Sequence, residues 1–192
     1  MRKGLLSAFV ISGIILIGGL IFVAWGTGVY DKAIKLQEDV EASWANVQAT
    51  YQRRADLVPN LVATVKGAAE SEKEILTRVT EARAGIVRAK TPQDLELLGR
   101  EINTAINLAF EAYPQIRSID NFSDLQSQLE GTENRINVAR QRYNEVVRDY
   151  NAYTRGYFKS MALSFFGKGE DFSRREGFQA TQGSETAPVV QF

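Results

Sequence analysis

The sequence contains no cysteine and no histidine, and these two absences exclude several kinds of chemistry. Zinc sites are usually built on imidazole or thiolate ligands, and thiol nucleophiles and histidine-based triads need residues that this chain lacks. The carboxylate–histidine di-iron centre of some helical bundles is excluded for the same reason. Disulfide bonds cannot form, so the cysteine count is compatible with any compartment.

An excess of charge of one sign is also missing. The chain has 23 Lys and Arg residues and 23 Asp and Glu residues. Arg2 and Lys3 precede a long uncharged segment that every acidic residue follows, so the chain after residue 30 has 21 basic and 23 acidic residues, a net charge of −2. A nucleic-acid binder carries a basic patch or stripe. Nucleic acid is therefore not an expected partner.

The segment from Gly4 to Tyr30 contains no charged residue. About 20 helical residues cross the roughly 30 Å hydrocarbon core of a bilayer, so Leu5 to Trp25 suffices, and Trp25 and Tyr30 suit an interfacial aromatic belt. A cleaved signal peptide has a shorter apolar core of about 7–15 residues and a small-residue cleavage site, which Ala24-Trp25-Gly26 does not supply. The sequence favours an uncleaved transmembrane anchor over residues 1–28, with membrane lipid as its partner.

The orientation of this anchor follows from its flanking charges. Arg2, Lys3 and the terminal amine favour a cytoplasmic N-terminus, although Lys32 and Lys35 at the other end weaken that bias. We expect a single-pass membrane protein with a short cytoplasmic N-terminus and the bulk of the chain outside the cytoplasm.

From Tyr30 onward, apolar residues recur at steps of three and four, the period of an α-helix. No segment keeps the alternation of a strand, so the sequence predicts an all-α fold in which a single N-terminal transmembrane helix precedes an elongated antiparallel helical bundle. Thr91 and Pro92 are typical of an N-cap and a first helical position, and Ser71 to Glu74 has the spacing of a capping box. The expected helices cover residues 30–66, 71–90, 92–113 and 124–155, and the first either continues the transmembrane helix or follows a short break at residues 26–28.

An asparagine follows an apolar or aromatic residue at every seventh position of the last helix, in Ile136-Asn137, Tyr143-Asn144 and Tyr150-Asn151. A heptad repeat is typical of a long straight seam between helices. The sequence therefore predicts a packing seam of Ile136, Tyr143, Asn144, Tyr150 and Asn151. The tyrosines are interpreted as core residues, and stacking on a ligand is the alternative.

Two charged residues interrupt the expected apolar stripes. The first stripe comprises Ala33, Leu36, Val40, Trp44, Val47, Tyr51, Val58, Leu61 and Val65, with a gap filled by Arg54. The last comprises Leu125, Leu129, Ile136, Ala139, Tyr143, Val146, Tyr150 and Tyr153, with a gap at Glu133. One hypothesis is a buried Arg54–Glu133 pair, with Asn60 or Asn134 completing its hydrogen bonds. The alternative is that both side chains extend from the edge of the seam to water.

The segment RRADLVPNLV places Pro59 inside an otherwise helical pattern. Proline removes a helical hydrogen bond and is one of the few identifiable causes of a kink. We interpret Pro59 as a kink, with Arg53, Asp56 and Asn60 near enough to satisfy the freed backbone groups.

The carboxylates Glu70, Glu72, Glu74 and Glu81 raise the question of an enzyme or a cation site. A solvated helix face explains them more simply, so a carboxylate-based enzyme is only a remote alternative. No catalytic residue, metal, cofactor or small-molecule substrate is expected. After Gly156, the segment YFKSMALSFF is expected to be a short docking helix or a membrane-surface patch, and residues 167–192 are expected to be extended or disordered, with APVVQF as a terminal strand or peptide ligand.

Two blocks of sequence resemble the LemA family of bacterial membrane proteins. They are WANVQATYQRRADLVPNLVATVKG and ENRINVARQRYNEVVRDYN, and the likeness extends to FFGKG and APVVQF near the C-terminus. The chain departs from the family where Ala68-Ala69 and Ser71-Glu72 replace an aromatic residue and a His-Glu pair. Any role of that histidine cannot apply here.

The resemblance implies a helical domain, here residues 29–166, that an N-terminal anchor holds outside the bacterial cytoplasmic (inner) membrane. It implies no enzymatic activity, and the frequent occurrence of family members near membrane-protease or envelope-stress functions suggests an adaptor. We therefore expect a non-enzymatic scaffold that binds other envelope proteins or forms homo-oligomers. The alternative is a protein that organises the membrane surface through residues 157–166.

Overall fold

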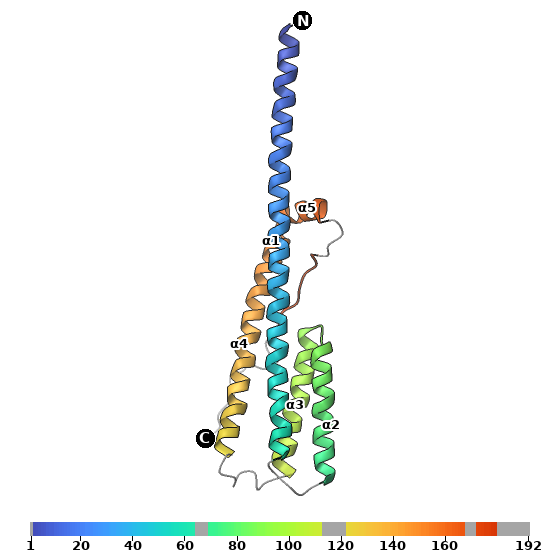
Figure 1. Cartoon of the computed structure of the whole chain (residues 1–192), viewed down its shortest axis with the longest axis vertical. Helices are drawn as coiled ribbons and strands as arrows, with labels where there is room; N and C mark the ends of the chain where they lie inside the picture. The colour runs from blue at the N-terminus through green and yellow to red at the C-terminus, as the bar shows by residue number, and fades with distance from the viewer. Residues whose placement is uncertain (1, 64–68, 113–121, 168–171, 180–192) are drawn as a thin grey trace, which may run out of the picture. The chain divides into compact units, whose positions relative to one another are not determined.

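The computed structural model of the chain describes residues 2–63, 69–112, 122–167 and 172–179. These ranges contain five helices and no strand, which confirms the all-α prediction (Figure 1). Residues 172–179 are neither helical nor paired as a strand, and residues 180–192, including APVVQF, lie outside the described part. The helices are α1 (Arg2–Ala63), α2 (Ala69–Arg88), α3 (Pro92–Ala112), α4 (Phe122–Thr154) and α5 (Tyr157–Phe166).

The chain divides into two compact units. The anchor unit comprises Met1–Glu41 and Val146–Arg175, and the bundle unit comprises Ala42–Glu145 and Glu176–Phe192. The divisions fall inside α1 and α4, so each unit contains part of both helices.

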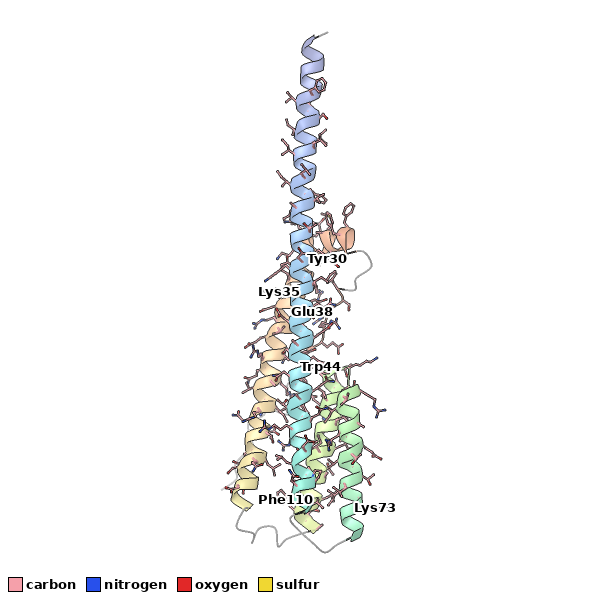
Figure 2. The ribbon with its side chains drawn as sticks, viewed as in Figure 1. Tyr30, Lys35, Glu38, Trp44, Lys73 and Phe110 are labelled. Atoms are coloured by element: carbon pink, nitrogen blue, oxygen red, sulfur yellow. The ribbon has the colours of Figure 1, made fainter. Side chains whose placement is uncertain are left out.

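In the anchor unit, α1 continues through residues 26–28 without the break that the sequence left open. It is long and apolar enough to cross a membrane, and its most apolar 18-residue window has a mean hydropathy of 2.4. From Phe9 to Val23 its large apolar side chains are exposed, and Figure 2 shows side chains projecting to both the left and the right of this part of the helix. An all-round apolar surface is typical of a helix that lipid surrounds.

The core of the anchor unit begins where this exposed surface ends. Helix α5 packs its Ala162 and Leu163 against Val29 and Ala33 of α1. Partly buried rings surround these four residues, namely Tyr30, Tyr153, Phe166 and Phe172. The Tyr153 hydroxyl donates a hydrogen bond to the Val29 carbonyl over 3.4 Å, and burial raises the pKa of this phenol.

In the bundle unit, α2 and α3 form a packed helical hairpin (Figure 1). The predicted start of α3 is confirmed, because Thr91 Oγ1 accepts a hydrogen bond from the Asp94 amide while Asp94 Oδ2 accepts one from the Thr91 amide. Hydrogen bonding with the Thr91 side chain is the main reason why the pKa of the Asp94 carboxyl is lowered. At the other side of the turn, Gln48 Nε2 donates to the Ile86 and Ala89 carbonyls. The Ile86 carbonyl also accepts from the Ala89 amide over 3.3 Å, so Gln48 adds a side-chain donor to the turn that follows α2.

The bundle core follows the helical period, with changes from the expected stripes. On α1, Ala55 is fully buried and occupies the position that the sequence had assigned to a gap at Arg54. On α4, the buried Thr132 fills the gap next to Glu133. The core of the anchor unit likewise contains Val147 where Val146 was expected. A helix advances 3.6 residues per turn, so counting in whole steps from a distant residue moved the expected stripe by one position.

Gly99 of α3 and Gly131 of α4 give opposite predictions for the same substitution. A Cβ on Gly99 would lie 2.6 Å from Tyr51 Cε1, whereas one on Gly131 would meet no described atom within 4 Å. Because alanine favours a helix over glycine by about 1 kcal/mol, we expect Gly131→Ala to stabilise the protein by about that amount. We expect Gly99→Ala to destabilise it by about 1–2 kcal/mol, since the buried Tyr51 ring has little room to move.

Urea unfolding of the full-length protein in detergent micelles, followed by circular dichroism, measures both changes. Equal stability of the two alanine variants would contradict the tight packing of Tyr51 on Gly99.

Candidate functional site

The side-chain amide of Asn144 binds the backbone of Phe178 at two points. Asn144 Nδ2 donates to the Phe178 carbonyl over 2.9 Å, and Asn144 Oδ1 accepts from the Phe178 amide over 2.8 Å. Backbone hydrogen-bonding groups must be paired when they are buried, and an extended segment usually pairs them with a neighbouring strand. Here a side chain on α4 takes the place of that strand.

The ring of Phe178 lies in an aromatic cage formed by Trp44, Tyr143 and Arg140. Trp44 stacks on it with centroids 6.1 Å apart, Tyr143 meets it edge-on at 5.6 Å, and the Arg140 guanidinium carbon lies 4.8 Å from its centre. The Tyr143 hydroxyl also donates to the Glu176 carbonyl over 3.2 Å. Only 7% of Phe178 is exposed. Trp44, which forms one wall of the cage, is labelled on α1 in Figure 2.

Gly177 allows this close approach. A Cβ at position 177 would lie 2.8 Å from Asn144 Oδ1, so a larger residue would push the segment away from the amide. The Gly177-Phe178 pair therefore combines a residue without a side chain at the closest contact with a ring that fills the cage.

The anchor unit contains a second pairing of the same kind. Asn151 Nδ2 donates to the Arg175 carbonyl over 2.8 Å, and Asn151 Oδ1 accepts from the Arg175 amide over 2.9 Å. Seven helical residues rise about 10.5 Å, and three extended residues span about 10 Å. The rise between Asn144 and Asn151 along α4 thus matches the length of extended chain between their partners, Phe178 and Arg175.

The heptad repeat therefore has two functions instead of one. The structure buries Ile136, Tyr143 and Tyr150 in the helical core, in the places assigned to them in the predicted seam. Asn144 and Asn151 are only half-buried. Instead of packing between helices, Asn144 binds the backbone of Phe178 and Asn151 binds that of Arg175. Asn137 is exposed, and within the described ranges no hydrogen bond to its side chain is found.

Two ion pairs join helices of the bundle unit, and one of them includes Arg140 of the cage. Arg140 Nη2 donates to Glu96 Oε1 of α3 over 2.6 Å, with both side chains at most 28% exposed. Arg54 Nη1 donates to Glu133 Oε2, which brings together the two residues of the predicted polar core. Both pairs act electrostatically on the phenol of Tyr51, whose pKa is raised chiefly by its own burial.

The geometry of the Arg54–Glu133 pair lies between the two readings of the sequence. The Arg54 side chain is 13% exposed and that of Glu133 is 49% exposed, so the pair forms at the edge of the core. Asn60 and Asn134 are exposed, and neither is bonded to the pair.

The residues around Pro59 bind other side chains. Helix α1 continues through Pro59 to Ala63, so the proline lies in the last turns of the described helix, and the kink remains a prediction. Asp56 Oδ1 accepts from Arg83 Nη2 of α2 over 2.9 Å instead of capping a backbone group. Arg53 lines a hollow of about 310 Å³ together with Arg135.

Of the four carboxylates considered for catalysis, only Glu74 and Glu81 have described side chains. Both line an open hollow of about 710 Å³ between α2 and α3, and Glu74 accepts hydrogen bonds from Arg78 over 3.1 and 3.2 Å. Within the described ranges, no group of three or more acidic side chains could hold a metal ion.

Removing the Asn144 amide tests the backbone pairing. We expect Asn144→Ala to raise the hydrogen-exchange rate of the Phe178 amide about 10- to 100-fold, because both bonds that hold this residue are lost. The exchange is measured by NMR on the full-length protein. Asn137→Ala on the same helix face is the matched control and should leave the rate unchanged. An unchanged rate in Asn144→Ala would show that the cage alone holds the segment.

A double-mutant cycle on Arg54→Met and Glu133→Met tests the ion pair. We expect a coupling free energy of about 0.5–1 kcal/mol that falls as salt is added, since Glu133 is half exposed. The matched cycle on Arg140→Met and Glu96→Met should give a larger coupling, because that pair is more enclosed. Denaturant unfolding of the four proteins in each cycle provides the values, and zero coupling for Arg54–Glu133 at low salt would refute a stabilising pair.

Comparison with known proteins gives a family. The model of the LemA family matches residues 43–192 of the chain. Protein LemA of Metamycoplasma hominis is 22% identical over 148 residues, which cover 75% of this chain and 67% of that protein. The matched region contains Trp44, Asn144 and the Gly177-Phe178 pair. Because the family model matches more than half of the sequence, the chain belongs to the LemA family.

Proposed function

We propose that this protein is a non-enzymatic, membrane-anchored scaffold of the bacterial envelope that binds extended polypeptide segments through the cage and Asn144. The observation that carries this proposal is the two-point pairing of Asn144 with the Phe178 backbone. A site that binds main-chain atoms accepts many sequences, and a pocket for one side chain adds selectivity. The partners it suits are envelope proteins, or further copies of this chain, that offer an extended segment with an aromatic residue.

The N-terminal apolar segment determines the proposed cellular location of this scaffold. Helix α1 begins with an apolar segment of transmembrane length whose side chains are exposed, and the flanking Arg2 and Lys3 favour a cytoplasmic N-terminus. We place the protein in the cytoplasmic membrane with a single span and most of the chain outside the cytoplasm. Tethering to the membrane raises the local concentration of neighbouring membrane proteins, so even a weak peptide site is useful there.

The segment that fills the site belongs to the same chain, so it competes with any partner. It is joined to α4 through α5 and residues 167–175, and such a covalent tether gives an effective concentration of roughly the millimolar range. A partner segment therefore has to bind more tightly than residues 176–178 or meet a protein from which this segment has been released. Self-assembly follows when the released segment of one copy occupies the site of another.

Binding of a synthetic peptide tests this proposal. A fluorescent peptide FSRREGFQ, with the sequence of residues 172–179, is added to the full-length Phe178→Ala variant in nanodiscs. We expect binding that is at least about tenfold tighter than that of FSRREGAQ, since burial of a phenylalanine ring contributes about 1.5–3 kcal/mol. Fluorescence anisotropy measures both affinities.

Two further variants control this experiment. The double variant Asn144→Ala, Phe178→Ala should lose the preference for FSRREGFQ, whereas Asn137→Ala, Phe178→Ala should keep it. The unsubstituted protein should bind more weakly than Phe178→Ala, because its own segment occupies the site. Equal binding of both peptides by all four proteins would exclude a peptide-binding site at the cage.

A further inference from the structure

Helix α5 has two apolar faces, and protein covers only one of them. Ala162 and Leu163 are buried against α1, and Phe166 is partly buried beside them. The other face consists of four large side chains that are 54–78% exposed, namely Tyr157, Phe158, Met161 and Phe165. At about 100° per residue, these four positions fall within an arc of about 100°. We call them the outer face of α5.

A soluble protein rarely exposes so compact a group of aromatic and apolar side chains. Of the polar residues of α5, Lys159 lies on the far side of the helix and Ser160 and Ser164 border this face, and all three side chains have local partners. Ser160 and Ser164 donate hydrogen bonds to the carbonyls of Tyr157 and Ser160, and Lys159 Nζ lies 4.1 Å from the centre of the Tyr153 ring. In the described part of the chain, the outer face meets Phe22 of α1 at its Phe165 end and is otherwise exposed.

The position of α5 identifies what covers this face. Phe22, near the end of the apolar segment of α1, lies 6.2 Å from the Phe165 ring and 5.6 Å from the Phe166 ring. The Phe166 ring packs so closely on Gly26 that a Cβ there would overlap it. Trp25, a residue typical of the membrane–water interface, lies between these two contacts in the sequence.

The direction of α5 agrees with this position. Within the anchor unit, α5 runs across α1 at the end of its apolar segment, where Figure 1 shows it projecting to the side. A helix that lies across a membrane-spanning helix at this level lies along the membrane surface. Amphipathic helices in that position bury their apolar face at the boundary of head groups and acyl chains.

We propose that α5 is an interfacial membrane helix whose outer face, Tyr157, Phe158, Met161 and Phe165, inserts into the bilayer surface beside α1. This inference rests on the membrane anchor of the proposed function. It adds a second membrane contact, made by a part of the chain about 130 residues after the span, and this contact fixes the depth at which α1 sits.

Site-directed spin labelling tests the inference, and the absence of cysteine makes every introduced label unique. The full-length protein carries a label at Phe158→Cys or Phe165→Cys on the outer face, or at Ser160→Cys on the polar side of α5. Leu16→Cys reports on the span, and Val87→Cys, on exposed α2, reports on water. The proteins are reconstituted in phosphatidylcholine–phosphatidylglycerol vesicles, and electron paramagnetic resonance measures collisions with oxygen, which enriches in lipid, and with a water-soluble nickel complex.

We expect the oxygen-to-nickel ratio at Phe158→Cys and Phe165→Cys to exceed that at Ser160→Cys and Val87→Cys several-fold, and to stay below that at Leu16→Cys. If Leu16→Cys reports lipid but the outer face matches Val87→Cys, the inference is wrong and the anchor stands. If Leu16→Cys itself reports water, the membrane anchor of the proposed function fails, and this inference fails with it.

Two other outcomes also overturn the inference. Labels on the outer face that neither reagent reaches would show that protein, such as a second copy of this chain, covers the face. Equal lipid exposure of Ser160→Cys and Phe158→Cys would show that α5 is immersed on all sides instead of lying at the surface.

Discussion

The bundle unit depends on the burial of Tyr51 against Gly99. The ring of Tyr51 on α1 occupies the space that a side chain at position 99 of α3 would take. The two ion pairs near this ring, Arg54–Glu133 and Arg140–Glu96, join α4 to α1 and to α3. Arg140 also contacts the Phe178 ring, so the aromatic cage is built on a side chain that the core has already fixed. A rigid wall of this kind is what a binding site needs if it is to hold a segment without large rearrangement.

Asparagine suits the face of a helix that binds an extended segment because its amide has one donor and one acceptor side by side, as a peptide group does. Asn144 uses both on one residue, and Asn151 does the same in the anchor unit. An aspartate at the same place could accept from the amide but could not donate to the carbonyl, which would leave that carbonyl unpaired. The chemistry of the side chain thus explains why the repeat contains asparagine and not another short polar residue.

Helical class, family and the start of α3 could be predicted from the sequence, because periodicity and the Thr91-Pro92 pattern are local signals. The approximate register of the core could also be predicted, but Ala55 and Thr132 show that a count of threes and fours drifts by one residue over long helices. The asparagine repeat was visible, yet its partners were not, because Arg175 and Phe178 are separated from it by an entire helix. A segment without periodicity carries no sign of what it binds.

The family match begins at residue 43, but the packing of α5 begins earlier. The Phe166 ring packs on Gly26, where a side chain would leave it no room, and Leu163 packs in the same cluster as Ala33. Gly26 and Ala33 both precede the matched region. Replacing the part of α1 before residue 43 by an unrelated apolar helix would therefore remove the surface on which α5 packs. The boundary recognised by sequence comparison and the boundary at which the protein can be cut and recombined differ by at least 17 residues, counted from Gly26 to residue 43.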